Sequence, residues 1–192
     1  MRPLGQPAVL LDFPSTGLRP QGDPMPVDPP MHNTSGDDPL RVRPAVPEDA
    51  VIIARYNRYL ALETERKALS ASTVEAGVRA LLADPSKGRY FVAVLEDRVI
   101  GQMMHTREWS DWRNGDIWWL QSVYVHPDHR GQGVFRALVS TLEAEARATP
   151  GVVGLRLYVE EHNERAHLAY DRMGFVRAGY LVREHLFFGD DE

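Results

Sequence analysis

Residues 123–134 read VYVHPDHRGQGV. The apolar run at the start of this stretch is typical of a buried strand, and Pro127 ends it. Gly131 and Gly133 then permit a tight turn. After the turn an apolar residue recurs at every fourth position, at Val134, Leu138, Leu142 and Ala146. The stretch therefore predicts a strand, a glycine turn and an amphipathic helix in succession.

A helix that begins directly after a glycine turn is a candidate anion site. Its first main-chain N–H groups lack partners within the helix, and the helix dipole is positive at this end. A plain turn is the commoner explanation of Gly-x-Gly before a helix, and it stays open here. The pattern Gly-x-Gly-x-x-Gly is incomplete because Arg136 occupies its last position, and the chain has no Gly-Lys-Ser/Thr. The sequence thus disfavours an ordinary Rossmann or P-loop nucleotide enzyme.

On either side of this stretch, periodicity and turn residues predict further elements. Before it we expect a strand, two helices and a hairpin, over residues 40–43, 48–69, 72–85, 90–95 and 99–106. The second of these helices would open on a capping box from Ser72 to Glu75. After the helix that begins at Val134 we expect a strand, a helix capped by Asn163 and two closing strands, over residues 153–159, 163–173 and 175–188.

The strand that leads into the glycine turn should extend over residues 117–125 and lie in the middle of its sheet. Strict alternation puts Ile117, Trp119, Val123 and Val125 on one face and Trp118, Leu120 and Tyr124 on the other. Both faces are then apolar, which is the pattern of a strand covered on both sides. Trp118 and Trp119 are accordingly expected in the core.

The composition fits one folded domain that follows a proline-rich arm. The chain has 192 residues, 43% of them hydrophobic, which suffices for one core. Eleven of the 14 prolines precede Glu48, and proline leaves little room for regular structure there. We expect a disordered arm over residues 1–39 and a single domain over residues 40–192.

Charge and cysteine content exclude several classes of protein. A formal net charge of -5 carries no basic footprint for nucleic acid. The chain has no cysteine, so disulfides, thiolate metal sites and a cysteine acyl-enzyme are excluded. It also lacks the run of roughly 18 to 20 apolar residues that spans a membrane. We expect a cytoplasmic protein that binds neither nucleic acid nor membrane.

Two motifs resemble those of a known family. Residues 123–134 are similar to the acyl-CoA-binding motif of the GCN5-related N-acetyltransferase (GNAT) superfamily, and residues 163–175 are similar to the motif that follows it. The resemblance extends over residues 40–188 in the family's order of elements. It implies an α/β fold, also classed as α+β, with a central mixed, mostly antiparallel sheet of about seven strands flanked by about four helices on both faces.

The resemblance also implies where the cofactor lies. The sheet would splay open between the strand that ends at Val125 and the strand that ends at Val159. The pantetheine arm of acetyl-CoA would lie in the split, and its pyrophosphate would lie on the amides of residues 130–134. Phe135 departs from the family, which has Gly or Ala there, and a bulky ring can narrow the space beside the pyrophosphate. The implied cofactor-binding residues are Val123, Tyr124, Val125, Arg130, Gly131, Gln132, Gly133, Val134, Phe135 and Asn163.

Tyr170 is the candidate general acid. It shares a helical face with Asn163 and Ala166, and the resemblance gives its phenol the role of protonating the departing thiolate. A core tyrosine with a satisfied hydroxyl is the alternative. The general base is left open, because Gln121 occupies the strand position where many relatives carry a carboxylate. The candidate bases are Glu108, Asp111, Glu160 and Glu161.

The acceptor side is expected at a tryptophan-rich loop. Trp109, Asp111 and Trp112 can receive a cationic amine beside aromatic planes, and a loop packed on its own aromatics explains them equally well. Glu63 and Glu65 are further candidates on the acceptor side, with an exposed helix face as the alternative. We expect no metal, because the histidines near the two motifs lack ligand spacing: His162 and His167, five positions apart, do not align on a helix.

We therefore expect an N-acetyltransferase that transfers the acetyl group of acetyl-CoA to a primary amine by direct attack in a ternary complex. Direct transfer follows from the missing cysteine and the missing Gly-x-Ser-x-Gly elbow. A non-catalytic acyl-CoA-binding or sensing module and a purely structural interaction domain are the alternatives. The expected acceptor is a small-molecule or peptide amine, and exposed aromatics near the closing strands would permit a homodimer.

Overall fold

A computed structural model describes residues 39–159, 161, 163–185 and 187. These residues form one sheet of five strands in the order β1-β2-β3-β4-β5. The strands are β1 (Arg41–Pro44), β2 (Arg89–Leu95), β3 (Arg98–Ser110), β4 (Gly115–Val125) and β5 (Val152–Leu157). The helices are α1 (Ala50–Glu65), α2 (Ala71–Ala83), α3 (Val134–Ala148) and α4 (Glu164–Arg172), with short 3-10 helices η1 (Pro47–Asp49) and η2 (Pro127–His129). The expected arm lies outside the described residues, except for Pro39.

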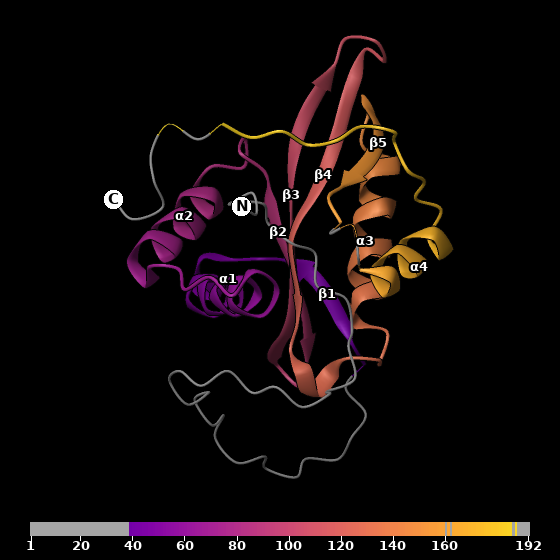
Figure 1. Cartoon of the computed structure of the whole chain (residues 1–192). Helices are drawn as coiled ribbons and strands as arrows, with labels where there is room; N and C mark the ends of the chain where they lie inside the picture. The colour runs from indigo at the N-terminus through magenta and orange to yellow at the C-terminus, as the bar shows by residue number, and fades with distance from the viewer. Residues whose placement is uncertain (1–38, 160, 162, 186, 188–192) are drawn as a thin grey trace.

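The sheet is mixed and covered on both faces. Strands β1 to β4 pair antiparallel in sequence order, and β5 joins β4 in parallel. Figure 1 shows α1 and α2 on one side of the sheet and α3 and α4 on the other. The largest buried cluster lies under α3 and α4 and includes Leu138 and Tyr170, whereas Ile53 and Val78 belong to a cluster under α1 and α2. The expectation of a mixed, mostly antiparallel sheet between helices is confirmed.

The expected count of about seven strands is wrong for the described residues, in which five strands form. The closing pair expected over residues 175–188 is absent from the part of that range that the structure describes, residues 175–185 and 187. There Val176, Tyr180 and Leu181 are 86%, 76% and 81% exposed. Apolar residues at strand-like spacing form a strand only where a neighbouring strand takes their main-chain hydrogen bonds, and spacing alone does not report that neighbour.

The two faces of β4 do not follow simple alternation. The strand contributes four side chains to the cluster under α3 and α4: Trp118, Leu120, Val123 and Val125. Alternation breaks between Leu120 and Val123, because Ser122 forms a β-bulge at which the register with β3 shifts and φ is 49°. The faces expected for Trp118 and Leu120, which precede the bulge, are therefore wrong. Trp119, expected in the core, is half-buried and packs against Tyr158 with ring centroids 4.3 Å apart and the planes tilted by 35°.

Local signals at the helix ends explain how the expected boundaries differ from the observed ones. α1 follows the 3-10 turn η1 and begins at Ala50, and it ends at Glu65 because Arg66 takes a left-handed conformation with φ of 56°. α2 begins one residue earlier than expected because Ser70, and not Ser72, is its N-cap. In the part of the chain that the structure covers, none of the helices is both long and apolar enough to cross a bilayer.

Candidate functional site

The turn between β4 and α3 is open on the side of its glycines. After Val125 the chain makes the 3-10 turn η2 and reaches Gly133, the N-cap of α3. Gly131 and Gly133 have φ of 77° and 84°, and a Cβ built on either would meet no described atom within 4 Å. The Ala137 amide makes the first bond of the helix, to the Gly133 carbonyl. The amides before Ala137 therefore lack partners within the helix and suit an anion.

The Arg130 side chain turns away from the glycines and ties the turn to α1. Its Nε donates to the Val125 carbonyl at 2.9 Å, and its guanidinium donates to Glu63 Oε2 at 2.8 Å. The Tyr124 hydroxyl donates to Glu63 Oε1 at 3.2 Å. Burial, and then the Glu63 carboxylate, raise the pKa of Tyr124. The side chains of Arg130 and Tyr124 are thus engaged within the protein, and Glu63, expected on the acceptor side, holds the turn.

The sheet opens where β4 approaches the glycine turn. β4 and β5 pair in parallel from Asp116 with Val152 to Leu120 with Leu157. β5 ends there, whereas β4 continues to Val125 along β3. The edge of β4 beyond Leu120 therefore faces a split between the two strands. An extended ligand in this split can bond to the main chain of β4 as a short extra strand does.

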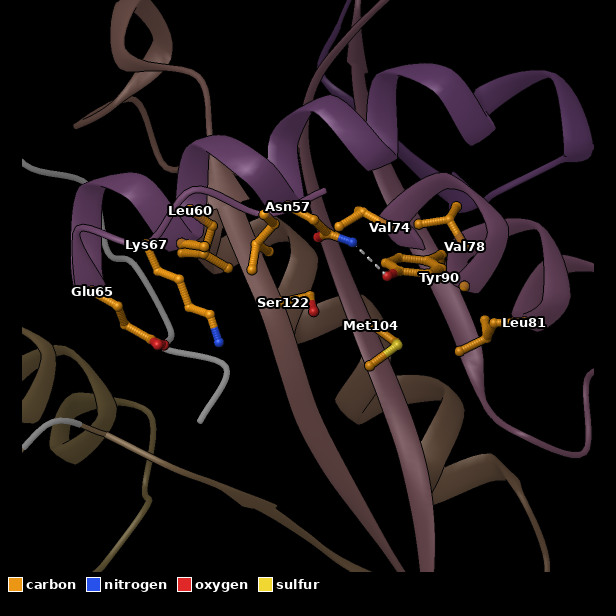
Figure 2. Close-up of a pocket in the computed structure, with 13 residues that line it drawn as sticks. Asn57, Leu60, Glu65, Lys67, Val74, Val78, Leu81, Tyr90, Met104 and Ser122 are labelled. Atoms are coloured by element: carbon orange, nitrogen blue, oxygen red, sulfur yellow. Dashed lines mark hydrogen bonds between the residues drawn. The ribbon is translucent and has the colours of Figure 1, made fainter. Parts of the chain in front are cut away.

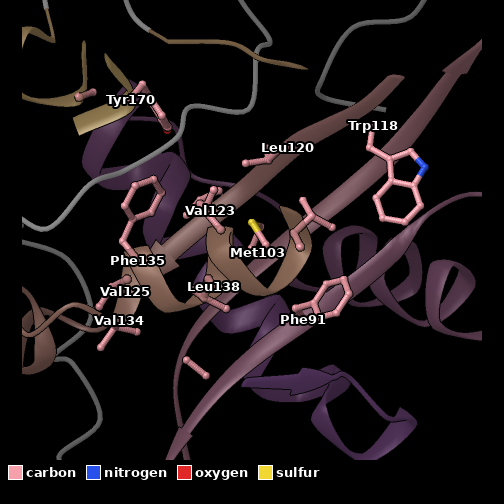
Figure 3. Close-up of a cluster of buried hydrophobic side chains, with 14 of the residues drawn as sticks. Phe91, Met103, Trp118, Leu120, Val123, Val125, Val134, Phe135, Leu138 and Tyr170 are labelled. Atoms are coloured by element: carbon pink, nitrogen blue, oxygen red, sulfur yellow. The ribbon is translucent and has the colours of Figure 1, made fainter. Parts of the chain in front are cut away.

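Tyr170 lies on α4 in the same buried cluster as Val123 and Val125 (Figure 3). Asn163 caps α4, since its side-chain oxygen accepts a hydrogen bond from the Ala166 amide at 3.0 Å, and the expected cap is confirmed. Tyr170 is 3% exposed, and its hydroxyl has no hydrogen-bond partner among the described residues. Burial raises the pKa of Tyr170 well above 10. The phenol therefore stays protonated and keeps a proton to donate.

The Phe135 ring fills the core and not the open side of the turn. It is 6% exposed and packs against the ring of Tyr170, and Phe175 packs against the same tyrosine. Tyr170 is therefore held between two rings while its hydroxyl stays unpartnered within the described part of the chain. A buried hydroxyl without a partner costs about 1–3 kcal/mol, so this one is a candidate for contact with a ligand.

A cavity of about 380 Å³ lies on the opposite face of the sheet, beneath α1 and α2 (Figure 2). Its polar lining includes Asn57, Tyr90 and Ser122. Its apolar lining includes Leu60, Val74, Val78, Leu81 and Met104. The sequence prediction missed this cavity, because the lining comes from two helices and three strands whose assembly no local spacing reports.

Residues 56–175, more than half of the chain, match the family model described as the acetyltransferase (GNAT) family. The chain belongs to this family. The matched residues include those of the glycine turn, those of β4 that border the split, and Tyr170. The resemblance drawn from the two sequence motifs is thereby confirmed.

Relatives of this GNAT protein bear names of N-acyltransferases. The chain is 33% identical over 76 residues to the thialysine N-epsilon-acetyltransferase of Bos taurus, covering 40% of this chain and 44% of the relative. It is 33% identical over 103 residues to the L-amino acid N-acyltransferase MnaT of Escherichia coli (strain K12), covering 52% and 58%. The chain thus spans about half the length of these curated relatives. The solved structure of a possible acetyltransferase from Clostridium difficile 630 is 39% identical, with a TM-score of 0.73 and coverage of 78% of this chain and 99% of that one.

The three residues of the tryptophan-rich loop expected at the acceptor side lie at the tip of the β3–β4 hairpin of this GNAT fold. They are Trp109, Asp111 and Trp112. Trp109 and Trp112 are 61% and 84% exposed, and the Asp111 side chain accepts a hydrogen bond from the Trp112 amide at 2.9 Å. β4 spans 11 residues between this tip and the glycine turn, which is roughly 35 Å of strand. The structure therefore does not bring these three residues together with Tyr170 or the turn.

The candidate general bases have varied surroundings. Glu108 accepts hydrogen bonds from an indole of β4 and, at 2.9 Å, from the Arg156 guanidinium of β5. Gln121, which occupies the family's carboxylate position, donates to a threonine hydroxyl of β3 at 2.8 Å. Glu160 lies outside the described residues, and Glu161 is exposed. Glu108 and Gln121 are thus held by contacts within the sheet.

The histidines next to the glycine turn make local contacts. His126 Nδ1 accepts a hydrogen bond from the Asp128 amide at 3.4 Å, and the His126 and His129 rings lie 6.0 Å apart. His162 lies outside the described residues. Among the residues whose placement is described, no group of three or more His, Asp or Glu side chains could hold a metal ion.

Proposed function

We propose that the protein is an acetyl-CoA-dependent N-acetyltransferase that acts on a primary amine by direct attack in a ternary complex. The observation that carries the proposal is the buried Tyr170 hydroxyl, which no other described residue satisfies, in one cluster with the β4 residues beside the split. A polar group buried in this way is expected to find its partner in a ligand. The names of the relatives, a thialysine N-epsilon-acetyltransferase and an L-amino acid N-acyltransferase, support an amine as the acceptor.

The chain would hold acetyl-CoA mainly with main-chain groups. The amides of residues 131–134 would take the diphosphate, because the Arg130 amide already donates to the Pro127 carbonyl at 3.3 Å. The open side of Gly131 and Gly133 leaves room for close approach. Val123 and Val125 would bond to the pantetheine arm along the split. The formal net charge is -5, so the net charge of the protein does not attract the anionic cofactor. The attraction would come from main-chain N–H groups that point toward the diphosphate.

In the proposed reaction the neutral amine nitrogen attacks the carbonyl carbon of the thioester. The C–N bond forms, the C–S bond breaks, and the departing thiolate takes the proton of the Tyr170 hydroxyl. The proton that the amine gives up restores the phenol by way of solvent, so one proton passes in net from amine to thiol. Direct attack needs no acyl-enzyme, and the chain has no cysteine with which to form one.

A non-catalytic acyl-CoA-binding or sensing module is the second candidate. Gln121 favours it, because an amide is no useful proton acceptor and this one already donates to Thr106 at 2.8 Å. Such a module would bind acetyl-CoA at the same turn and split, and its acetyl group would stay on the sulfur.

CoA release over a panel of primary amines separates these two functions, read beside the thermal shift with acetyl-CoA. Acetyl transfer predicts amine-dependent thiol release together with a raised Tm. A raised Tm with no thiol release for any amine would favour the binding module. If the protein is correctly folded and acetyl-CoA leaves its Tm unchanged, both functions are contradicted. If the protein becomes acetylated and passes this acetyl group to an amine, direct attack is contradicted.

A further inference from the structure

The cavity beneath α1 and α2 lies next to the point where the sheet splits. Ser122 lines the cavity, and it stands two residues beyond Leu120, the last residue of β4 that pairs with β5. Tyr170 belongs to α4, which lies with α3 on the other face of the sheet (Figure 1). At Ser122 the cavity therefore borders β4 just beyond its pairing with β5, on the face opposite to that of Tyr170.

We propose that this cavity binds the acceptor, and that the acceptor is a primary amine with an uncharged aliphatic or aromatic body. The inference rests on the proposed acetyl transfer and names its substrate class. An amine bound in the cavity attacks the thioester from one face of the sheet, while the Tyr170 hydroxyl protonates the departing thiolate from the other face. The two reactants then do not compete for the same space.

One end of the cavity is apolar. The side chains that gather there are Val74, Val78 and Leu81 of α2 and Met104 of β3 (Figure 2). They can bury the methylene groups or the ring of a ligand, but they offer no counter-charge to a second ammonium group. The charged lining residues Glu65 and Lys67 stand apart from this end in Figure 2.

The polar groups between the two ends are neutral and already bonded to one another. The Asn57 amide donates to the Tyr90 hydroxyl at 2.9 Å and accepts a hydrogen bond from the Gln102 amide at 2.6 Å. Tyr90 also shares a hydrogen bond with the Ser122 side chain, and burial raises the pKa of Tyr90. Because the phenol stays protonated, this network carries no charge. It therefore disfavours an acceptor whose body is charged.

Gly77 keeps one wall of the cavity open. It lies in the middle of α2, where glycine is a weak helix former, and it lines the cavity. A Cβ built at this position would meet none of the described atoms within 4 Å. A volume of about 380 Å³ is near the lower end of the range for ligand pockets, so a small amine fits. A larger side chain at position 77 would fill part of that space.

The first test uses two pairs of amines that differ in a terminal charge. n-Pentylamine is compared with 1,5-diaminopentane, and norleucine with lysine, by CoA release from the full chain at saturating acetyl-CoA. In each pair that reacts, kcat/KM should be at least about tenfold higher for the apolar member, because a second ammonium at the apolar end of the cavity would be buried without a counter-charge. An equal or higher value for the charged member overturns the inference and leaves acetyl transfer standing.

The second test places the acceptor in the cavity directly. Gly77→Leu should raise the KM of the best amine at least about tenfold and change the KM of acetyl-CoA by less than about twofold, because the leucine enters the cavity and not the split. The matched control is Ala76→Leu, at an exposed neighbour on the same helix that is not among the lining residues, and it should leave both constants within about twofold. If Gly77→Leu leaves the KM of every reacting amine unchanged, the acceptor binds elsewhere and the inference fails. If no amine of a wider panel releases CoA although acetyl-CoA binds, acetyl transfer itself is refuted, and the inference with it.

Discussion

The ring of Phe135 meets the ring of Tyr170 edge to face, with centroids 5.7 Å apart and an interplanar angle of 77°. Phe135 lies in the first turn of α3 and Tyr170 near the end of α4. One aromatic contact therefore joins the helix that begins at the glycine turn to the helix that carries the proposed acid. Such pairs contribute about 0.5–1.5 kcal/mol beyond the burial of their area.

Replacing the buried ring tests this contact. Phe135→Ala should lower the free energy of unfolding by about 3–5 kcal/mol, because it leaves a cavity between α3 and α4. Phe135→Leu, which keeps most of the volume, should lower it by about 1 kcal/mol. Urea unfolding measures both values. A small loss for Phe135→Ala together with tighter binding of acetyl-CoA would instead mean that the ring crowds the glycine turn.

Removing the Tyr170 hydroxyl should separate catalysis from binding. Tyr170→Phe is expected to lower kcat by about 100-fold and to leave the thermal shift with acetyl-CoA unchanged. The variant should be as stable as the parent or more so, because the lost hydroxyl is buried and no described group bonds to it.

Tyr56→Phe is the matched control for that hydroxyl. The Tyr56 hydroxyl donates to the Val99 carbonyl at 2.7 Å, so its removal should cost about 1 kcal/mol of stability and leave kcat unchanged. An unchanged kcat for Tyr170→Phe would dismiss the acid role. Equal losses of kcat in the two variants would point to a general effect on the fold.

Two glycines with the same backbone conformation distinguish a ligand effect from backbone strain. Gly133 and Gly151 both have φ of 84° and open space where a Cβ would stand, as far as the described residues reach, but only Gly133 lies at the turn. Alanine at either position should destabilise the fold by about 1–2 kcal/mol. Only Gly133→Ala should also raise the Kd for acetyl-CoA, by at least about tenfold, because its Cβ stands where the diphosphate approaches. Calorimetry that finds the same Kd for both variants would place the diphosphate away from the turn.

The burial of His105 leads us to expect a loss of stability in mild acid. It is 1% exposed and stacks on Trp118 with ring centroids 4.2 Å apart. Burial, and then the cations of Arg107 and Arg89, lower the pKa of His105 from 6.5 to about 4. The unfolded chain therefore binds more protons between these two values, so stability falls as the pH falls through that window. From pH 7 to pH 5 this group should remove about 2 kcal/mol from the free energy of unfolding.

Urea unfolding at the two pH values, with His105→Phe alongside, checks this assignment. The variant should lose most of the acid-induced decrease, because phenylalanine does not titrate. If parent and variant lose the same free energy between the two pH values, other groups cause the acid sensitivity.

The parts of the site that a short stretch of chain controls were predictable from the sequence. Gly131 and Gly133 adopt the positive φ that the Gly-x-Gly pattern predicts. Asn163 caps α4 because its hydrogen-bond partner is only three residues away. The helix that carries Tyr170 was placed for the same reason, since its cap and its apolar face lie within one turn or two of each other.

The parts that depend on distant partners were not predictable. The bulge at Ser122 arises from the register between β4 and β3, and it reverses the faces expected for Trp118 and Leu120. The ion pair between Arg130 and Glu63, at 2.8 Å, joins the glycine turn to α1, and no local spacing relates these two parts of the chain. The cavity beneath α1 and α2 likewise exists only once these two helices cover three strands.

The most direct test of acetyl transfer at this site is a crystal structure of the protein with bound acetyl-CoA. We expect the diphosphate oxygens within about 3 Å of the amides of residues 131–134 and the thioester sulfur within about 3.5 Å of the Tyr170 hydroxyl, in the split beside β4. A diphosphate held by other groups, or a sulfur that does not approach Tyr170, would contradict this function for the turn and the split.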